Sequence, residues 1–170
     1  MKERDANRKE FSLLIEKHQA IIHKVAMIYA QGPADREDLF QEICLQLWHA
    51  YPNFRGDAKF STWMFRVALN TAISKVRQNK NRPEYESLQE YDGLAIENPD
   101  EARQLKLLYK AISQLNRIDK AMILLWLEEK SYSEIAEMLG TSKANVSVKL
   151  VRIKRKLEEM VQDAEEREPF

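Results

Sequence analysis

The chain has 170 residues, enough for one domain or two small ones. Its 27 basic and 27 acidic residues balance, so net charge alone favours no class of partner. The lone Cys44 excludes an internal disulfide. No stretch resembles a signal peptide or a membrane span, so we expect no membrane insertion and a cytoplasmic location. Four glycines, with few alternating strand patterns, predict an all-α fold.

Charge is distributed unevenly along the chain. Residues 1–82 hold 14 basic and 9 acidic side chains, and residues 104–170 hold 12 and 11. Between them, residues 83–103 hold 1 basic and 7 acidic side chains, together with two prolines and Gly93. We therefore predict two small helical domains, 1–82 and 104–170, joined by a flexible acidic linker over residues 83–103.

The first domain is predicted to open with two amphipathic helices. Apolar residues recur at helical spacing over residues 10–30, and Gly32 followed by Pro33 ends that helix. A second helix opens near Asp35, and its buried stripe is Leu39, Ile43 and Leu47. The other side of this helix carries the polar residues Asp38, Gln41, Glu42 and Gln46. Periodicity alone does not distinguish that side from an ordinary solvated face.

A loop rich in aromatic, amide and basic side chains follows over residues 51–57, before a third helix that Ser61 or Thr62 can cap. This helix carries a polar stripe of Arg66, Asn70, Ser74 and Arg77. Residues 55–82 contain a single acid, Asp57. A basic helix beside an aromatic loop is typical of single-stranded nucleic-acid binding, in which cations contact phosphates and rings stack on bases. The alternative places the aromatic side chains in the core, and it is favoured for Phe60 and Trp63.

The second domain is predicted to contain four helices. Residues 104–115 and 120–129 supply two, and the rest of the domain forms a helical hairpin. In the first hairpin helix, Tyr132, Ile135, Ala136 and Leu139 share one face. Ser133 can cap that helix, and Gly140 can end it in a left-handed conformation. Ser142 can cap the last helix, which buries Val146, Leu150, Ile153 and Leu157 and is expected to fray from residue 161 on.

The last helix also has a polar face without acids. Between residues 143 and 156 there are six basic residues and no acid. The basic residues are Lys143, Lys149, Arg152, Lys154, Arg155 and Lys156. Two short helices joined by a tight turn, the second with a basic face, are typical of a helix-turn-helix that binds the DNA major groove. The alternative is a helical hairpin whose charged face is only solvated.

Residues for catalysis or metal binding do not gather in the sequence. The three histidines are scattered, and one cysteine cannot build a zinc site. No glycine-rich phosphate loop, nucleophile elbow or spaced carboxylate pair is present. We therefore expect a protein that is not an enzyme, with no catalytic residue, cofactor, metal or small-molecule substrate.

Several motifs follow one another in the order found in one protein family. The first is Asp35-x-x-Asp38-Leu39-x-Gln41-Glu42, followed by Phe54-Arg55-Gly56, Phe60-Ser61-Thr62-Trp63-Met64 and Ala68-Leu69-Asn70. Later come Tyr132-Ser133-Glu134-Ile135-Ala136 and the helix over residues 146–154. Through this ordered set, which covers nearly the whole chain, the sequence resembles bacterial sigma factors of the extracytoplasmic-function group. These are compact sigma-70 relatives with only the second and fourth conserved regions.

The resemblance implies a protein that binds core RNA polymerase and directs it to promoters. The residues expected to bind the clamp helices of the β′ subunit are Asp35, Asp38, Leu39, Gln41, Glu42 and Gln46. Those expected to capture and open the −10 element are Asn53, Phe54, Arg55, Lys59, Trp63, Arg66, Asn70, Ser74 and Arg77. Those expected to bind the −35 duplex are Ser142, Lys143, Asn145, Ser147, Lys149, Arg152, Lys154 and Arg155. The polymerase β flap and an anti-sigma factor are further implied partners.

Several positions depart from the family pattern, among them Asn145 and Val148, which stand where a threonine and a serine are usual. Ser74 stands where an aspartate is usual, and Asn116 follows Leu115 where a proline is usual. Lys149 stands where an arginine is usual, which keeps the positive charge but loses the bidentate fork of the guanidinium. Asn145 suits either pairing with adenine or capping of the last helix.

Two other classes of protein remain as alternatives at this point. A stand-alone helix-turn-helix regulator would bind duplex DNA without polymerase and would not need the aromatic loop and its basic helix. A helical adaptor that binds no nucleic acid is disfavoured by the acid-free face over residues 143–156.

Overall fold

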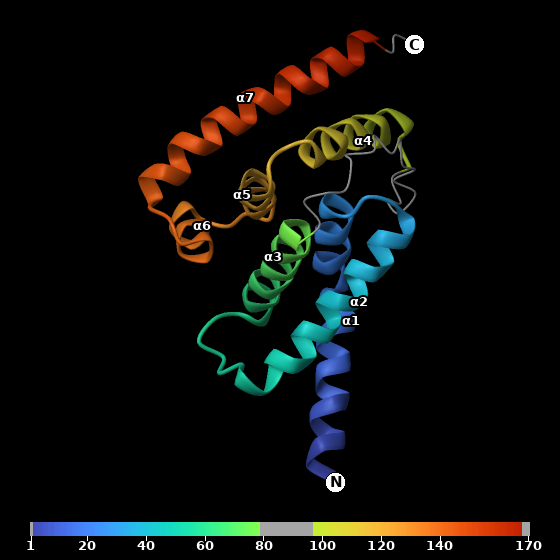
Figure 1. The fold of residues 1–170 in the computed structure, drawn as a ribbon, viewed down its shortest axis with the longest axis vertical. Helices are drawn as coiled ribbons and strands as arrows, with labels where there is room; N and C mark the ends of the chain where they lie inside the picture. Colours follow the sequence, from blue (N-terminus) through green and yellow to red (C-terminus); the bar gives the residue numbers. More distant parts are fainter. Residues whose placement is uncertain (1, 79–96, 168–170) are drawn as a thin grey trace. The chain divides into compact units, whose positions relative to one another are not determined.

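The computed structural model describes residues 2–78 and 97–167. Contacts between Cα atoms divide the chain into two compact units, Met1–Ser87 and Leu88–Phe170, here called the N-terminal unit and the C-terminal unit. The described residues form seven α-helices and one short 3-10 helix, with no strand among them (Figure 1). This confirms the predicted all-α fold. No helix within these described ranges is long and apolar enough to cross a membrane.

The N-terminal unit consists of α1 (Lys2–Tyr29), α2 (Pro33–Ala50), the 3-10 helix η1 (Tyr51–Asn53) and α3 (Phe60–Gln78). The three long helices pack pairwise around one apolar core. Its largest fully buried side chains are Ile22, Ile28, Leu39, Ile43, Leu47, Met64 and Phe65. Helix α1 begins eight residues before the predicted start at residue 10. Residues 5–9 of that extension are exposed, so no apolar periodicity marked it in the sequence.

The starts of α2 and α3 also differ slightly from prediction. Helix α2 begins at Pro33, whose fixed φ suits the first helical position, and Gly32 before it has a φ of 117°. Helix α3 begins at Phe60, with the Trp63 amide donating to the Lys59 carbonyl at 3.1 Å. Ser61 and Thr62 therefore lie inside the helix, and the prediction that one of them caps it is wrong.

The C-terminal unit consists of α4 (Pro99–Ser113), α5 (Arg117–Leu127), α6 (Tyr132–Leu139) and α7 (Lys143–Arg167). Helix α4 begins five residues earlier than predicted, because the Asn98 side chain caps it and Asp100 and Glu101 suit the positive end of the helix dipole. Residues 99–103 are therefore helical rather than linker. Residues 79–96 lie outside the described residues, and with them residues 83–96, the larger part of the predicted linker.

Side-chain caps define the other helix starts of this unit. Asn116 caps α5, its side-chain oxygen accepting from the amides of Ile118 and Asp119 at 3.1 and 2.9 Å. Ser131, not Ser133, caps α6, because Ser131 forms a reciprocal capping box with Glu134. The prediction of Ser133 is therefore wrong by two residues.

The turn between α6 and α7 follows the prediction closely. Gly140 ends α6 in the left-handed region, with φ 66° and ψ 39°. The Ser142 hydroxyl accepts from the Asn145 amide at 3.1 Å and so caps α7. Helix α7 then continues to Arg167, beyond the predicted fraying point at residue 161. All four residues of its predicted buried stripe are buried: Val146, Leu150, Ile153 and Leu157.

Candidate functional site

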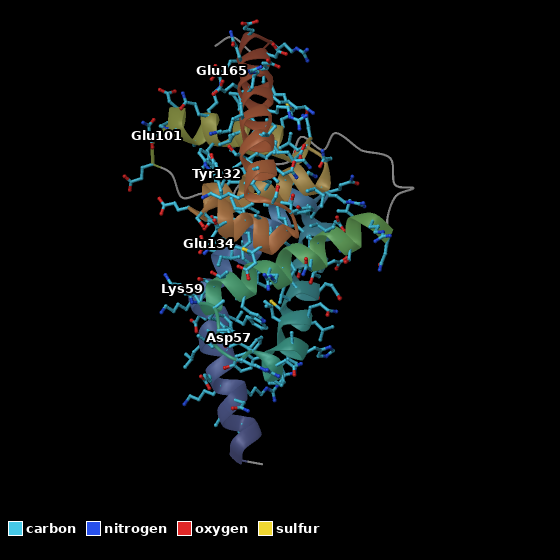
Figure 2. All side chains as sticks on the ribbon, turned by 90° about the vertical axis from the view of Figure 1, so that its left-hand side faces the viewer. Asp57, Lys59, Glu101, Tyr132, Glu134 and Glu165 are labelled. Atoms are coloured by element: carbon cyan, nitrogen blue, oxygen red, sulfur yellow. The ribbon has the colours of Figure 1, made fainter. Side chains whose placement is uncertain are left out.

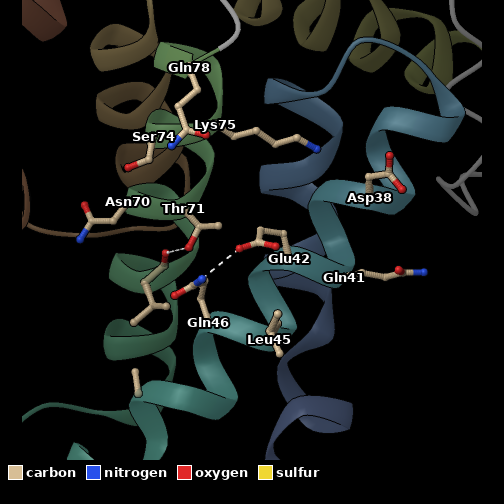
Figure 3. A pocket seen from close by; sticks show the side chains of 12 residues that line it. Asp38, Gln41, Glu42, Leu45, Gln46, Asn70, Thr71, Ser74, Lys75 and Gln78 are labelled. Carbon is tan, nitrogen blue, oxygen red and sulfur yellow. Dashed lines mark hydrogen bonds between the residues drawn. The ribbon is translucent and has the colours of Figure 1, made fainter.

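A groove runs between α2 and α3 in the N-terminal unit (Figure 3). Its volume is about 870 Å³. The α2 side chains that line it are Asp38, Gln41, Glu42, Leu45, Gln46 and Ala50. The α3 side chains that line it are Val67, Asn70, Thr71, Ser74, Lys75 and Gln78. The fold therefore brings part of the candidate polymerase-binding set next to Asn70 and Ser74 of the candidate −10 set.

The polar side of α2 is solvent-accessible within this groove. Asp38, Gln41 and Gln46 are exposed, and Glu42 is partly exposed. The Gln46 side-chain amide donates to the Glu42 carboxylate at 2.9 Å, which holds both groups on the groove side of the helix. These four side chains are positioned to meet a partner from outside.

Two predicted polymerase-binding residues serve the fold instead. Leu39 is 1% exposed, so its side chain packs in the core beneath α2 and is not accessible to a partner. The Asp35 carboxylate accepts from the Gln31 amide at 2.9 Å and pairs with the Lys75 ammonium at 3.2 Å. Asp35 therefore links the α1–α2 turn to α3, and Leu39 presents almost no surface to a partner in this structure.

The sequence interpretation missed Leu45 as a member of the α2 face. Leu45 lines the groove and is 47% exposed, although leucine usually marks a buried stripe. Its spacing of three and four residues from Glu42 and Gln41 is the sequence signal that would have found it.

Aromatic rings gather where η1 leads into α3. The ring centroids of Phe54 and Trp63 lie 5.0 Å apart, those of Phe60 and Trp63 5.4 Å, and those of Phe54 and Phe60 5.6 Å. Tyr51 joins them at 6.3 to 6.5 Å. Each of the four residues is only partly buried. The sequence left two alternatives open: rings buried in the core, or rings free to stack on bases. The partly buried cluster lies between these two alternatives.

The aromatic cluster is tied to α1. Phe11 of α1 lies 5.1 Å from Tyr51 and 5.1 Å from the exposed Trp48 ring. Burial, and next the charge and hydrogen bond of Glu10, raise the pKa of the Tyr51 hydroxyl.

Exposed polar residues surround this cluster on the loop and on α3. Asn53, Arg55 and Lys59 are exposed, and Figure 2 shows Lys59 and Asp57 on the loop that leads into α3. Gly56 has a φ of 78°, which glycine adopts without strain and which turns the loop. Along α3, the predicted stripe of Arg66, Asn70, Ser74 and Arg77 is exposed throughout.

In the C-terminal unit, most of the predicted polar face of α7 is accessible. Ser142, Lys143, Asn145, Arg152 and Arg155 are exposed, while Ser147 and Lys149 are partly exposed. The Asn145 side-chain amide donates to the Thr141 hydroxyl at 2.6 Å. This bond links the start of α7 to the preceding turn, but Asn145 does not cap the helix, because Ser142 does.

The Lys154 ammonium contacts another helix. It lies 4.7 Å from the centroid of the Trp126 ring of α5, in a cation–π contact. Lys154 therefore contributes to packing between α7 and α5, and it is a weaker candidate for DNA contact than Arg152 or Arg155. The described residues contain no group of three or more His, Cys, Asp or Glu side chains that could hold a metal ion.

Two family models match the sequence segments that form these surfaces. The model described as Sigma-70 region 2 matches residues 14–82, and the model described as Sigma-70, region 4 matches residues 105–157. Together these ranges contain every candidate residue from Asp35 to Arg155. The chain belongs to the sigma-70 family.

Full-length relatives place this sigma factor in the extracytoplasmic-function group. The ECF RNA polymerase sigma-E factor of Escherichia coli strain K12 is 29% identical, over 92% of this chain and 88% of the relative. The RNA polymerase sigma-H factor of Pseudomonas aeruginosa is 26% identical, over the same shares of the two chains, 92% and 88%. The protein is therefore an alternative sigma factor that directs transcription initiation.

Solved structures share the fold. The sigma factor RpoE of Bartonella quintana, solved with the anti-sigma factor NepR, matches with a TM-score of 0.67 and 17% identity, over 91% of this chain and 96% of that one. CnrH, solved with the cytosolic domain of CnrY, matches with a TM-score of 0.65 and 22% identity, over 92% and 90%. A stand-alone regulator is not favoured, because residues 14–82 match sigma region 2.

Proposed function

We propose that this sigma factor binds core RNA polymerase through the groove side of α2 and promoter DNA through α3 and α7. The groove carries this proposal, because it places Glu42 and Gln46 of α2 opposite Asn70 and Ser74 of α3. Asp38 and Glu42 would repel DNA phosphates, so the α2 face suits a protein partner. Arg66 and Arg77 on α3 suit phosphates.

The proposed polymerase contact is the β′ clamp helices. Asp38, Gln41, Glu42 and Gln46 supply hydrogen-bonding groups, and the exposed Leu45 supplies apolar contact beside them. A polar rim around a central apolar side chain is the usual arrangement of a protein–protein interface.

The proposed −10 site combines the loop, the aromatic cluster and the α3 stripe. The packed rings of Phe54 and Trp63 would form a firm support for an unstacked base, while Asn53, Arg55 and Lys59 contact its edge and backbone. Flipping a base costs a few kcal/mol, which these contacts and polymerase binding must offset. Ser74 would contact the strand as a neutral group, so it would neither repel phosphates nor accept as a carboxylate does.

The proposed −35 site is the exposed face of α7. Arg152 and Arg155 would contact phosphates or guanine edges, and Lys149 would contribute a single charge. In this arrangement residues 1–82 bind polymerase and the −10 element, residues 104–170 bind the −35 element and the polymerase β flap, and the acidic segment 83–98 joins them.

An anti-sigma factor is a further proposed partner. The structural relative from Bartonella quintana was solved with one. The groove of about 870 Å³, with its exposed Leu45, offers such a protein the same face that polymerase would use. Occupation by either partner would then exclude the other.

The protein would act by binding alone, with the chemistry of RNA synthesis supplied by the polymerase. We place it in the cytoplasm, where a bacterial chromosome and its polymerase are located. Its role there is to change which promoters the polymerase selects.

Binding of core polymerase by charge-reversed variants tests the α2 assignment. Glu42→Lys should lower affinity for core RNA polymerase by at least about tenfold, because it reverses a charge in the proposed contact face and removes the acceptor that orients Gln46. Glu37→Lys is the matched control, since Glu37 is exposed on the same helix outside the groove. Equal affinities of the wild type and Glu42→Lys would contradict the assignment.

A further inference from the structure

Helix α7 exposes two valines in its middle. Val148 is 59% exposed and Val151 is 52% exposed. Since successive helical residues are rotated by about 100°, Val148 lies about 160° around the helix from each of the buried residues Val146 and Leu150. The two valines therefore lie on the side of α7 opposite the core. Single exposed apolar residues are ordinary, but two neighbours on one helix face form a small ridge.

Cations border this ridge. Arg152 follows Val148 by four residues, and Arg155 follows Val151 by four, so each arginine lies on the same side of the helix as a valine. Both arginines are exposed, and residues 143–156 contain no acid. An apolar ridge bordered by cations and by no acid suits a polyanion that offers an apolar group at its centre.

The DNA major groove offers such a group. Thymine presents its C5 methyl there, and small apolar side chains contact it. Val148 and Val151 are separated by about 4.5 Å along the helix axis, somewhat more than the rise of one base pair. Two thymines at neighbouring positions would therefore lie within reach of the two side chains.

We infer that Val148 and Val151 recognise thymine methyl groups in the −35 element. This inference rests on the proposed function, in which α7 binds the −35 duplex. It makes these valines specificity-determining residues and predicts at least one thymine in the −35 sequence that this sigma factor selects. The arginines position the helix on the phosphates, while the valines distinguish thymine from uracil and from cytosine.

Replacement of thymine by deoxyuridine tests the inference, because it removes only the methyl group. Holoenzyme reconstituted from the full chain and core polymerase would first select its promoters from genomic fragments. Each −35 thymine would then be replaced by deoxyuridine, and holoenzyme affinity measured. We expect a loss of about fourfold at one or two positions, the effect of one methyl group losing apolar contact. With Val148→Ala or Val151→Ala holoenzyme, the loss at the matching position should be smaller, because alanine reaches less far toward the thymine methyl.

Leu13→Ala is the matched control. Leu13 is 58% exposed on α1, outside every proposed surface, so this variant should keep the full sensitivity to deoxyuridine. Selected promoters with no −35 thymine, or thymines whose replacement has no effect, would overturn the inference and leave the proposed function intact. Weaker core-polymerase binding by Val148→Ala with unchanged base preference would also overturn it, in favour of a protein contact. Failure to form holoenzyme, or to select any −35 sequence, would overturn the proposed function and the inference together.

Discussion

The two units build their candidate binding surfaces in different ways. In the C-terminal unit, hydrogen bonds between residues three or four apart define the α6–α7 hairpin, as between Ser131 and Glu134 or Asn145 and Thr141. In the N-terminal unit, the surface is assembled from helices distant in sequence, as in the ion pair between Asp35 and Lys75.

The two surfaces therefore depend on different stabilising interactions. Caps and turns stabilise the hairpin through local hydrogen bonds. Each cap contributes about 1 kcal/mol to the free energy of unfolding. The groove and the aromatic cluster depend on packing among α1, α2 and α3, so one core substitution would alter them all. The following predictions test this contrast, beginning with the largest expected effect.

The two cores should unfold separately. Leu47→Ala and Leu150→Ala each remove a side chain that is 0% exposed, and each should lower the free energy of unfolding of its own unit by about 2–5 kcal/mol. Calorimetry of the full chain should show one shifted transition for each variant. A shift of both transitions by either variant would show that the units unfold as one.

Arg152 and Lys154 should differ sharply in their effect on DNA binding. Arg152→Ala should weaken −35 binding by about 1–3 kcal/mol and leave core-polymerase binding unchanged. Lys154→Ala should have little effect on DNA affinity, because the Lys154 ammonium lies against the Trp126 ring. Equilibrium binding of holoenzyme to promoter DNA would measure both. Equal losses for the two variants would contradict the orientation of Lys154.

Ser131 and Ser133 provide a matched pair for the capping box. Ser131→Ala removes the acceptor for the Glu134 amide and should lower the free energy of unfolding of the C-terminal unit by about 1 kcal/mol. Ser133→Ala, two residues later inside α6, should change it very little. Chemical denaturation followed by circular dichroism would compare them. A larger loss for Ser133→Ala would reverse the assignment of the cap.

Two glycines with positive φ test whether local strain matters equally in the two units. A Cβ at Gly140 or Gly56 would meet no atom within 4 Å, so only backbone strain is added. Gly140→Ala should cost about 1 kcal/mol of unfolding free energy, because α6 and α7 fix the turn. Gly56→Ala should cost less, because its neighbours in the exposed loop can adjust. Thermal denaturation would measure both, and an equal or larger cost at Gly56 would argue against an adaptable loop.

The smallest expected effect concerns His18 of α1. Partial burial, and next the charge of Lys17, lower the pKa of His18 below its ordinary 6.5. Below pH 6.5 the unfolded chain binds this proton more readily than the folded one, so stability decreases until the pH has passed the folded pKa. The melting temperature of the N-terminal unit should therefore decrease on acidification in wild type and less so in His18→Gln. Identical profiles would exclude this contribution.

Sequence periodicity predicted the helices of both units, but it placed some of their ends wrongly. Ser131 and Ser133 both precede apolar residues, and only the Ser-x-x-Glu spacing to Glu134 separates them. The start of α4 was obscured because acids at a helix N-terminus resemble an acidic linker. In both cases the required signal was present, and a competing pattern concealed it.

The role of individual site residues was less predictable. Periodicity placed Leu39 in the buried stripe of α2 while the family motif placed it among the polymerase-binding residues, and its side chain is buried. Lys154 lies within the basic run of α7, yet its ammonium contacts the Trp126 ring of α5. Val148 and Val151 lack charge, so the charge pattern of α7 did not point to them, although both are more than half exposed.

The sequence by itself determined the all-α class, the helical hairpin with its turn at Gly140, and the order of motifs that marks the sigma-70 family. These features depend on contacts between residues close along the chain, which periodicity and capping chemistry encode directly. Only the tertiary structure decided that α2 and α3 form one groove, that Asp35 serves the fold, and which basic residues of α7 remain accessible. Those outcomes depend on contacts between side chains of different helices, and local sequence patterns do not encode such contacts.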